Sequence, residues 1–314
     1  MPGGPADPYP QEGNLRVAWG KATELGCGVD DRVSQLIDLA LEEDIGPGDV
    51  TSEYFVPADR EGRAFLVAKS DGVVAGVKLG AEVFRRVDAG IEINIMLQDG
   101  SAIAPGAYVM EAAGKARSLL TAERTVINFV QRLSGVATKT ALFVEAVKGT
   151  GATIIDTRKT TPGWRSLEKA AVVAGGGQNH RMGLYDRAMV KDNHLVVEGG
   201  VEALRESALR LKEAHPGVGV EVEAETLEQV EAFLDIEEVD YLLLDNMENE
   251  QMKKAVEMRG DRERPLLEAS GGVNLDTVRG IAETGVELIS VGILTHSATA
   301  LDLSLEFVSS EERN

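Results

Sequence analysis

Two short basic stretches contain most of the residues that could do chemistry in this chain. The first, DTRKTTPGWR at 156–165, directly follows the apolar run ATII, and the second, NHRMGLYDRAMVKDNH, spans 179–194. The candidate binding residues in them are Thr157, Arg158, Lys159, His180, Arg181 and Lys191. Guanidinium groups suit planar carboxylates because they bind them in a bidentate manner, whereas Lys acts more as a point charge. These stretches therefore predict an anion-binding site.

The charge of the surrounding segment supports this prediction. From Arg124 to Lys191 the chain has eleven Lys and Arg against four Asp and Glu, which gives +7, although the whole chain carries −20. Basic residues concentrated inside an acidic chain favour a pocket for a small, highly anionic ligand. Each charge-assisted hydrogen bond in such a pocket contributes roughly 1.5–3 kcal/mol.

Two carboxylates, Glu223 and Asp245, each end a predicted strand. Acidic side chains would repel an anionic ligand unless a cation lay between them. Mg²⁺ commonly has this role, since it is held by one or two carboxylates together with substrate phosphates. The alternative is that each carboxylate pairs with a nearby Arg or Lys.

Glycines and a small hydroxyl residue follow the last two predicted strands. The candidates for binding a phosphate are Ser270, Gly271, Gly272 and Gly292, and a helix is predicted to start near Asn274. Late-strand glycines and a helix N-terminus often hold a phosphate in βα barrels. Ordinary turn chemistry would explain the same residues.

The elements that must position these residues alternate as strands and helices. The predicted strands are ATIID, RAMVKD, GVEVEAE, VDYLLLDN, PLLEASGG and ELISVG, and their last residues are charged, small or hydroxylated. The predicted helices span 200–214, 226–234, 248–258 and 274–284, with another after Pro162 that has Thr161 as its N-cap. Alternating βα units predict a parallel sheet covered by helices, either closed as a barrel or, as the second choice, open and doubly wound. In a barrel the site forms at the carboxyl ends of the strands.

The first part of the chain has a different pattern. Residues 1–29 are rich in Pro and Gly and are expected to form a flexible tail. Strand patterns then predominate, with a hairpin expected at Asp71-Gly72, so that 30–117 should form a mostly antiparallel sheet with helices. We expect 297–314 to join this domain. The barrel should span 118–296, beginning with a long helix interrupted near Ser134-Gly135.

Composition excludes several classes of protein. A charge of −20 argues against broad binding to nucleic acid or to an anionic membrane. Cys27 is the only cysteine, so neither an intrachain disulfide nor a zinc knuckle is expected. The sequence begins without a signal-peptide pattern and has no apolar run long enough to span a membrane. A cytoplasmic protein is the expectation.

The motifs taken together resemble a known family. LEEDIGPGDVTS, TAERTVINFVQRLSGVAT, DTRKTTPGWR, GGGQNHRMGLYDRAMVKDNH, EVEAETLEQV, LLLDNM, EASGGVN and VGILTHS occur in order over about residues 31–308. They resemble quinolinate phosphoribosyltransferase, which makes nicotinate mononucleotide, pyrophosphate and CO₂ from quinolinate and phosphoribosyl pyrophosphate with Mg²⁺. The resemblance implies an irregular parallel α/β barrel plus an open-faced N-terminal α/β domain. It also implies a homodimer with shared active sites, or a hexamer.

The resemblance also implies a role for each candidate residue. Arg158, His180 and Arg181 would hold the quinolinate carboxylates, with Lys159 and Lys191 nearby, and Arg124 would be donated across the dimer. Glu223 and Asp245 would bind the ribose hydroxyls and the metal–pyrophosphate. Ser270, Gly271 and Gly292 would hold the 5-phosphate. Two alternatives remain at this stage: a related phosphoribosyltransferase for another carboxylated base such as nicotinate, and a non-catalytic anion-binding barrel.

Overall fold

The fold is described from a computed structural model of the chain, for residues 31–191 and 200–308. The expected tail at 1–29, Cys27, and the strand-end residues Asp192 and Asn193 lie outside the described residues. The chain divides into two compact units, which are described separately. The described part of the N-terminal unit comprises 31–141, 160–176 and 294–308, and that of the barrel unit comprises 142–159, 177–191 and 200–293.

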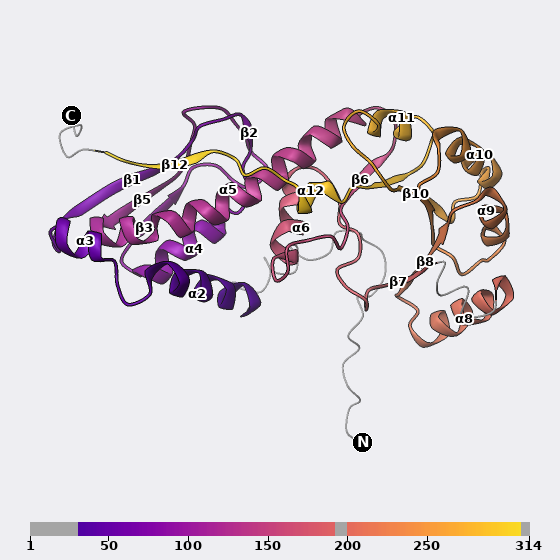
Figure 1. Cartoon of the computed structure of the whole chain (residues 1–314), viewed down its shortest axis with the longest axis horizontal. Coiled ribbons are helices and arrows are strands. Elements are labelled where there is room, and N and C mark those ends of the chain that lie inside the picture. The colour runs from indigo at the N-terminus through magenta and orange to yellow at the C-terminus, as the bar shows by residue number, and fades with distance from the viewer. Residues whose placement is uncertain (1–30, 192–199, 309–314) are drawn as a thin grey trace, which may run out of the picture. The chain divides into compact units, whose positions relative to one another are not determined.

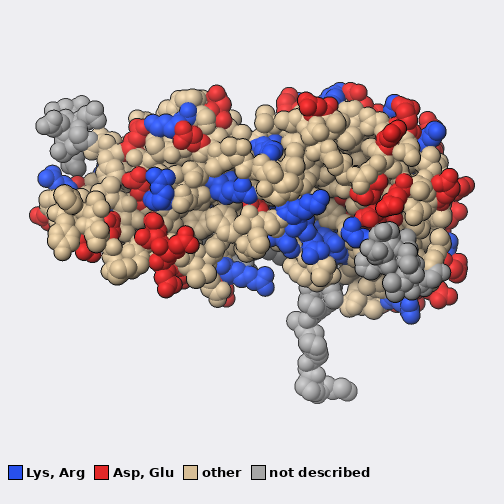
Figure 2. Space-filling view, in the orientation of Figure 1, with Lys and Arg blue, Asp and Glu red and all other residues tan. Residues whose placement is uncertain are grey.

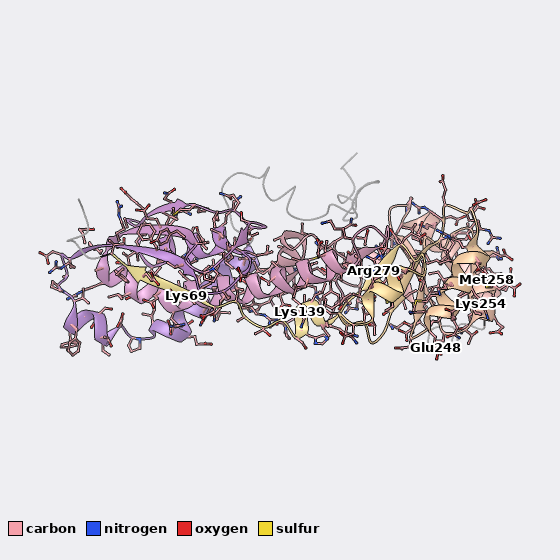
Figure 3. The ribbon with its side chains drawn as sticks, turned by 90° about the horizontal axis from the view of Figure 1, so that it is seen from above. Lys69, Lys139, Glu248, Lys254, Met258 and Arg279 are labelled. Atoms are coloured by element: carbon pink, nitrogen blue, oxygen red, sulfur yellow. The ribbon has the colours of Figure 1, made fainter. Side chains whose placement is uncertain are left out.

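The barrel unit contains six parallel strands in the order β6-β11-β10-β9-β8-β7. In chain order they are β6 (Thr153–Ile155), β7 (Arg187–Val190), β8 (Gly219–Ala224), β9 (Tyr241–Asp245), β10 (Leu266–Ser270) and β11 (Leu288–Ser290). All six predicted strands are therefore confirmed. The helices between them are α8 (Val201–Ala214), α9 (Leu227–Leu234), α10 (Asn249–Arg259) and α11 (Val278–Ala282). Figure 1 shows these helices along the outside of the sheet, and Figure 3 labels Lys254 and Met258 on α10.

Strand register decides which side chains share a face of this sheet. One face of the sheet carries buried apolar side chains, such as those of Val222, Leu244 and Ala269. Because side chains alternate along a strand, the other face receives the residues between them. Leu243 on β9 pairs with both Glu223 on β8 and Glu268 on β10. Carboxylates from two strands therefore flank Leu243 on this second face.

The N-terminal unit contains a four-stranded antiparallel sheet in the order β12-β1-β5-β3. Its strands are β1 (Glu61–Ala68), β3 (Glu92–Ile95), β5 (Tyr108–Lys115) and β12 (Leu303–Phe307), and a separate pair is formed by β2 (Gly72–Val73) and β4 (Ala102–Ile103). Its helices are α2 (Asp31–Ile45), α3 (Val50–Phe55), α4 (Val77–Val87), α5 (Ala116–Ala146), α6 (Arg165–Ala174) and α12 (Ile293–His296). Figure 1 shows β12, from the end of the chain, beside β1. Lys69, labelled in Figure 3, forms an ion pair with Glu306 on β12.

Two predictions for the N-terminal unit are wrong. The hairpin expected at Asp71-Gly72 does not form, because β1 pairs with β5 and β12 while β2 pairs with β4. Helix α5 also continues through Gly135, where a Cβ would lie 2.1 Å from the carbonyl oxygen of Thr299. Gly135 thus permits a close backbone approach and does not interrupt the helix.

The predicted N-cap at Thr161 is also wrong, since α6 begins at Arg165 with Trp164 at the cap. Gly163 has φ of 82°, which no α-helical residue adopts. The N–H and hydroxyl of Thr161 both donate to the buried carboxylate of Glu168, each over 2.9 Å. Thr161 therefore anchors the loop as a donor. Among the helices that the structure describes, none has the length and apolar character needed to cross a bilayer.

Candidate active site

The two basic stretches lie side by side at the end of β6. The buried carboxylate of Asp156 accepts a hydrogen bond from the backbone N–H of His180 over 2.8 Å, and the N–H of Asp156 donates to the carbonyl of Gln178 over 3.1 Å. A parallel bridge joins Ile155 to Gln178. Residues 157–159 and 180–181, which are far apart in sequence, are thus brought together by backbone contacts.

The guanidinium groups of Arg158 and Arg181 are close enough to interact electrostatically. Both residues are half-buried. Burial, and next the charge of Arg158, lower the pKa of Arg181. The side chain of Arg181 donates to the carbonyl of Arg187 over 3.2 Å and to Sδ of Met189 over 3.3 Å. Like charges held together in this way favour binding of an anion that neutralises both.

Figure 2 shows how charge is distributed over this unit. Lys and Arg atoms form a compact group near the position of β7 in Figure 1, whereas Asp and Glu atoms are spread over the region of α9 and α10. The exposed side chains of Lys159 and Lys191 come from the same two basic stretches. The distribution agrees with the segment charge of +7 in an acidic chain.

A cluster of carboxylates lies at the ends of β8 and β9. Oxygen atoms of Glu223, Glu225 and Asp245 all lie within 4.8 Å of one another. The ammonium of Lys191 lies 2.6 Å from Oε2 of Glu223, so the local pairing considered for this carboxylate does occur. Asp245 accepts from Nδ2 of Asn246 over 2.7 Å. Oxygen donors of this kind fit Mg²⁺, and the sequence interpretation had not included Glu225.

The predicted phosphate residues lie at the ends of β10 and β11. Ser270 pairs in register with Asp245, and Gly271 follows it with φ of 99°. A Cβ on Gly271 would lie 2.1 Å from Oδ1 of Asn246, so only glycine fits there. The helix start expected near Asn274 is wrong, because α11 begins at Val278. Asn274 instead closes a turn by accepting from the N–H groups of Asp276 and Thr277.

Gly272 and Gly292 complete the predicted phosphate set. Gly272, with φ of 60°, is exposed, and Gly292 is half-buried directly after β11. The structure therefore places all four candidates at the carboxyl ends of neighbouring strands. Any phosphate site here would depend on the backbone and on Ser270, because the helix that follows is short and begins later.

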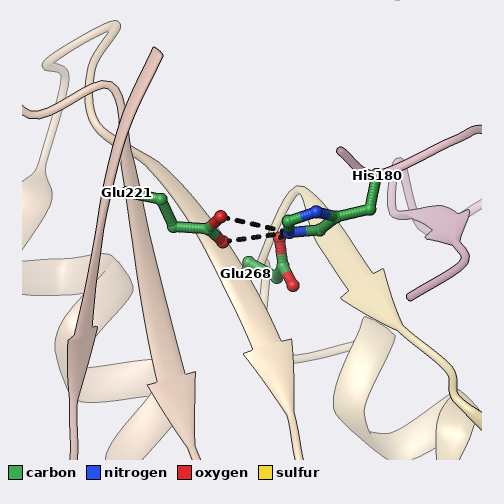
Figure 4. A group of neighbouring side chains, drawn as sticks. All are labelled: His180, Glu221 and Glu268. Atoms are coloured by element: carbon green, nitrogen blue, oxygen red, sulfur yellow. Dashed lines mark hydrogen bonds and ion pairs between the residues drawn. The ribbon is translucent and has the colours of Figure 1, made fainter. Parts of the chain in front are cut away.

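Sequence reasoning missed a buried group next to the arginines. Glu221 and Glu268 are completely buried and face the ring of His180, which is 6% exposed (Figure 4). Nε2 of His180 lies 3.1 Å from Oε2 of Glu221 and 3.4 Å from Oε2 of Glu268. A terminal nitrogen of Arg187 lies 3.6 Å from Oε2 of Glu221, and this guanidinium also stacks over the ring of Tyr241.

The electrostatics of this group are unusual. Burial lowers the pKa of His180, but the charges of Glu268 and Glu221 and their hydrogen bonds raise it to about 9. Burial, together with the charge of Glu221, raises the pKa of Glu268. One sequence signal could have revealed Glu221, since the strand GVEVEA alternates Val with Glu, where a buried parallel strand is usually apolar throughout.

One predicted residue, Arg124, is not placed in this group. Arg124 is exposed on α5, in the N-terminal unit. A cavity of about 510 Å³ in the N-terminal unit is a poor anion site because Glu42, Asp49 and Glu53 line it. Of its two arginines, Arg117 donates to the carbonyls of Val56 and Glu53, and Arg86 forms ion pairs with Asp38 and Glu82.

Comparison with family models gives a match over nearly all of the described chain. The C-terminal domain model of quinolinate phosphoribosyl transferase matches residues 136–306, and the N-terminal domain model matches residues 49–134. The chain belongs to the quinolinate phosphoribosyltransferase family. The boundary between the two matches falls within α5.

Individual relatives agree with the family assignment. The chain is 42% identical over 287 residues to a tobacco quinolinate phosphoribosyltransferase, with 86% of this chain and 81% of the relative covered. It is 42% identical over 281 residues to the nicotinate-nucleotide pyrophosphorylase of Mycobacterium leprae, with 88% and 97% covered. The solved nicotinate-nucleotide pyrophosphorylase of Francisella tularensis is 35% identical, with a TM-score of 0.84 and coverage of 90% and 98%.

Proposed function

We propose that this enzyme transfers the phosphoribosyl group of phosphoribosyl pyrophosphate to quinolinate and releases pyrophosphate and CO₂. The product is nicotinate mononucleotide, and the reaction belongs to de novo NAD synthesis. The observation that carries the proposal is the half-buried pair Arg158 and Arg181 at the end of β6, in the same unit as the carboxylates of Glu223 and Asp245. The reaction requires cations that bind the two carboxylates of quinolinate. It also requires acidic side chains that hold the metal ion bound to the diphosphate.

Quinolinate and phosphoribosyl pyrophosphate are both polyanions, so they repel each other in water. Arg158 and Arg181 would bind the ring carboxylates, with Thr157 and Lys159 at the edge of the same loop. Fixed cations in a partly buried site stabilise such ligands more than water does. The protein's contribution is then chiefly to hold two repelling molecules in reactive geometry.

Mg²⁺ fits the carboxylate cluster, because hard oxygen donors from Glu223, Glu225 and Asp245 converge there. These residues would hold the ion directly or through water and pyrophosphate, and it would neutralise charge on the leaving diphosphate. Lys191 already neutralises one oxygen of Glu223 and would remain available to an incoming anion. Ser270, Gly271, Gly272 and Gly292 would hold the 5-phosphate through hydroxyl and backbone N–H groups.

The proposed reaction requires no side chain of the protein to act as a general base. The pyridine nitrogen attacks C1 of the ribose, where positive charge develops as the bond to pyrophosphate breaks. The quaternary nitrogen then stabilises the electron pair left on the adjacent ring carbon when the 2-carboxylate leaves as CO₂. A proton from solvent completes the product. Arg158 and Arg181 would orient the carboxylates throughout.

Assembly and location complete the proposal. The enzyme works as a homodimer, or as a hexamer built from dimers, in which Arg124 of one subunit reaches the barrel site of its partner. Its place is the cytoplasm. The exposure of Arg124 on α5 supports a role outside its own unit.

Release of pyrophosphate, measured with phosphoribosyl pyrophosphate and Mg²⁺, tests the function. We expect release when quinolinate is supplied and none when it is withheld. Free nicotinate should replace quinolinate poorly, since it offers one carboxylate to two arginines. Equal turnover of nicotinate would point to a phosphoribosyltransferase for another base, and binding of these anions without pyrophosphate release would point to a non-catalytic barrel.

A further inference from the structure

The polar groups of Thr161 hold a loop and do not cap a helix. Thr161 lies two residues after Lys159, and α6 begins only at Arg165, with a cap residue that makes no side-chain hydrogen bond. The N–H of Thr161 donates to Oε2 of Glu168, and its hydroxyl donates to Oε1, each over 2.9 Å. A helix cap would instead accept a hydrogen bond through its side chain. These contacts therefore fix the loop that joins the basic stretch to α6.

Glu168 can hold this loop because its own carboxylate is fixed. The side chain is completely buried on α6, and Oε1 also accepts from a terminal nitrogen of Arg132 over 2.6 Å. Arg132, on α5, donates further to the carbonyls of Thr295 and Ala298. Hydrogen bonds between charged groups are about twice as strong as neutral ones. Three segments of the N-terminal unit therefore keep the carboxylate in one place.

Other contacts order the rest of this loop. The ring of Trp164 stacks on that of Phe129 from α5, with 4.9 Å between the ring centroids. The hydroxyl of Thr160 accepts from Nε of Arg165 over 3.0 Å. The loop is thus bound to both α5 and α6.

The order of the loop extends to the cations that precede it. Successive Cα atoms are about 3.8 Å apart, so the Cα of Lys159 lies no more than about 7.5 Å from that of Thr161. The N–H of Lys159 donates to the hydroxyl of Thr157 over 3.0 Å, and the buried Asp156 is held by a backbone N–H of the second basic stretch. Arg158 therefore lies on a short segment that is held on both sides.

We infer that Glu168 and Arg132 are positioning residues, which hold Thr161 and thereby keep Arg158 and Lys159 in the conformation that binds a substrate carboxylate. The inference rests on the proposed function for the identity of that substrate. A segment that is ordered before its ligand arrives loses less conformational entropy on binding, so the affinity is higher. Both positioning residues act through Thr161.

Thr161 is the residue to vary, because loss of the buried Glu168 would leave Arg132 without its carboxylate and destabilise the fold. Thr161 is exposed, so its variants should fold. Thr161→Val removes the hydroxyl but keeps the size and branching of the side chain, whereas Thr161→Ser keeps the hydroxyl. Thr150→Val, which removes a hydroxyl that donates to the carbonyl of Val147, is the control.

Hydrogen exchange of the full chain without ligand, resolved to single amides, tests the order of the loop. The N–H of Thr161 should exchange at least about a hundredfold more slowly than in an unstructured peptide, because it donates to a buried carboxylate. After correction for intrinsic rates, Thr161→Val should speed exchange at this position by about threefold or more. Unprotected exchange at residue 161 of the unaltered chain would overturn the inference even if no variant folds.

Affinity for quinolinate, measured by calorimetry on the full chain, tests the positioning role. Thr161→Val should weaken binding by about three- to tenfold, since the basic segment would be ordered for a smaller fraction of the time. Thr161→Ser and Thr150→Val should stay within about twofold of the original affinity. In steady-state kinetics, Thr161→Val should raise the KM for quinolinate by a similar factor and leave kcat within about threefold.

The measurements separate a positioning role from a merely structural one. Unaltered exchange in Thr161→Val, or faster exchange with unaltered quinolinate affinity, would overturn the inference. Equal weakening in Thr161→Val and Thr161→Ser would also overturn it, because the hydroxyl would then make no difference. The proposed function fails separately: an unaltered chain that binds no quinolinate refutes that function, whereas the order of the loop is measured without any substrate.

Discussion

The ammonium of Lys191 lies 2.6 Å from Oε2 of Glu223, although sequence reasoning had assigned this cation and this acid to different substrates. The pair joins the basic stretch to the carboxylate cluster at the ends of the strands. Lys191 therefore neutralises part of a cluster whose three carboxylates lie within 4.8 Å of one another. Anions can approach this cluster only while its charge is balanced.

Lys191→Gln should lower kcat/KM for quinolinate by about tenfold or more, because the carboxylates would then repel both substrates. The melting temperature should fall modestly as well, because the Lys191 side chain is 48% exposed but that of Glu223 is only 8% exposed and would lose its cation. Steady-state kinetics and thermal unfolding measure the two effects. Lys148→Gln, which breaks an exposed pair with Glu145, is the matched control. Unaltered kinetics in Lys191→Gln would contradict this role.

Arg158→Ala should raise the KM for quinolinate and reduce kcat/KM by roughly ten- to a hundredfold, the cost of losing a charge-assisted hydrogen bond or two. The variant should stay folded, because it removes one of two like charges and relieves the effect of Arg158 on Arg181. Lys254→Ala, on the exposed side of α10 in Figure 3, is the control for loss of a cation. A folded Arg158→Ala enzyme with the original KM would refute carboxylate binding by this residue.

The strands of the barrel unit could be predicted because apolar runs and chain breaks are local signals. The strand ends could be predicted as well, since parallel strands bring their carboxyl ends to one edge. The actual role of Thr161 could not be predicted in this way. Its N–H and hydroxyl donate to Glu168, seven residues further on, instead of capping a helix. The continuous helix at Gly135 could not be predicted either. Glycine is needed there because the backbone of Thr299, far along the chain, packs closely against it.

The buried part of the site was the hardest to predict. Glu221 and Glu268 are ionisable residues in strands expected to be apolar. Pairing with β9 puts Glu221 opposite Tyr241 and Glu268 opposite Leu243, so both lie on the same face of the sheet. The placement of His180 depends on two backbone N–H groups, its own to Asp156 and that of Arg181 to Nδ1, which no side-chain pattern encodes. Three-dimensional register, not residue type, determines this group.

Chelation of divalent metal should abolish pyrophosphate release if the carboxylate cluster holds Mg²⁺. Glu223→Gln and Asp245→Asn should each raise the Mg²⁺ concentration needed for half-maximal activity by about tenfold or more, because each removes a charged oxygen donor. Titrating Mg²⁺ at saturating substrates measures this shift. Glu231→Gln should leave the titration unchanged. The same Mg²⁺ requirement in all four proteins would exclude a metal-binding role for these acids.

Arg124→Ala and Arg181→Ala should each be nearly inactive alone if active sites are shared between subunits. Mixing the two inactive variants should restore part of the activity, since some mixed dimers combine an intact Arg124 from one subunit with an intact Arg181 from the other. Subunit exchange is followed independently, for example with two different affinity tags. Proven exchange without any recovered pyrophosphate release would contradict the shared site.

Glu268→Gln should change how stability depends on pH. Burial and the charge of Glu221 raise the pKa of Glu268 above its ordinary value of 4.5, so above that pH the folded chain retains a proton that the unfolded chain loses. The unfolding free energy of the original protein therefore falls as pH rises through this window. Gln cannot titrate, so the variant should gain stability relative to the original as pH rises above the ordinary value of 4.5. Urea unfolding at several pH values measures the difference, with Glu231→Gln as the control. A difference that stays constant with pH would mean that Glu268 is ionised in the folded chain.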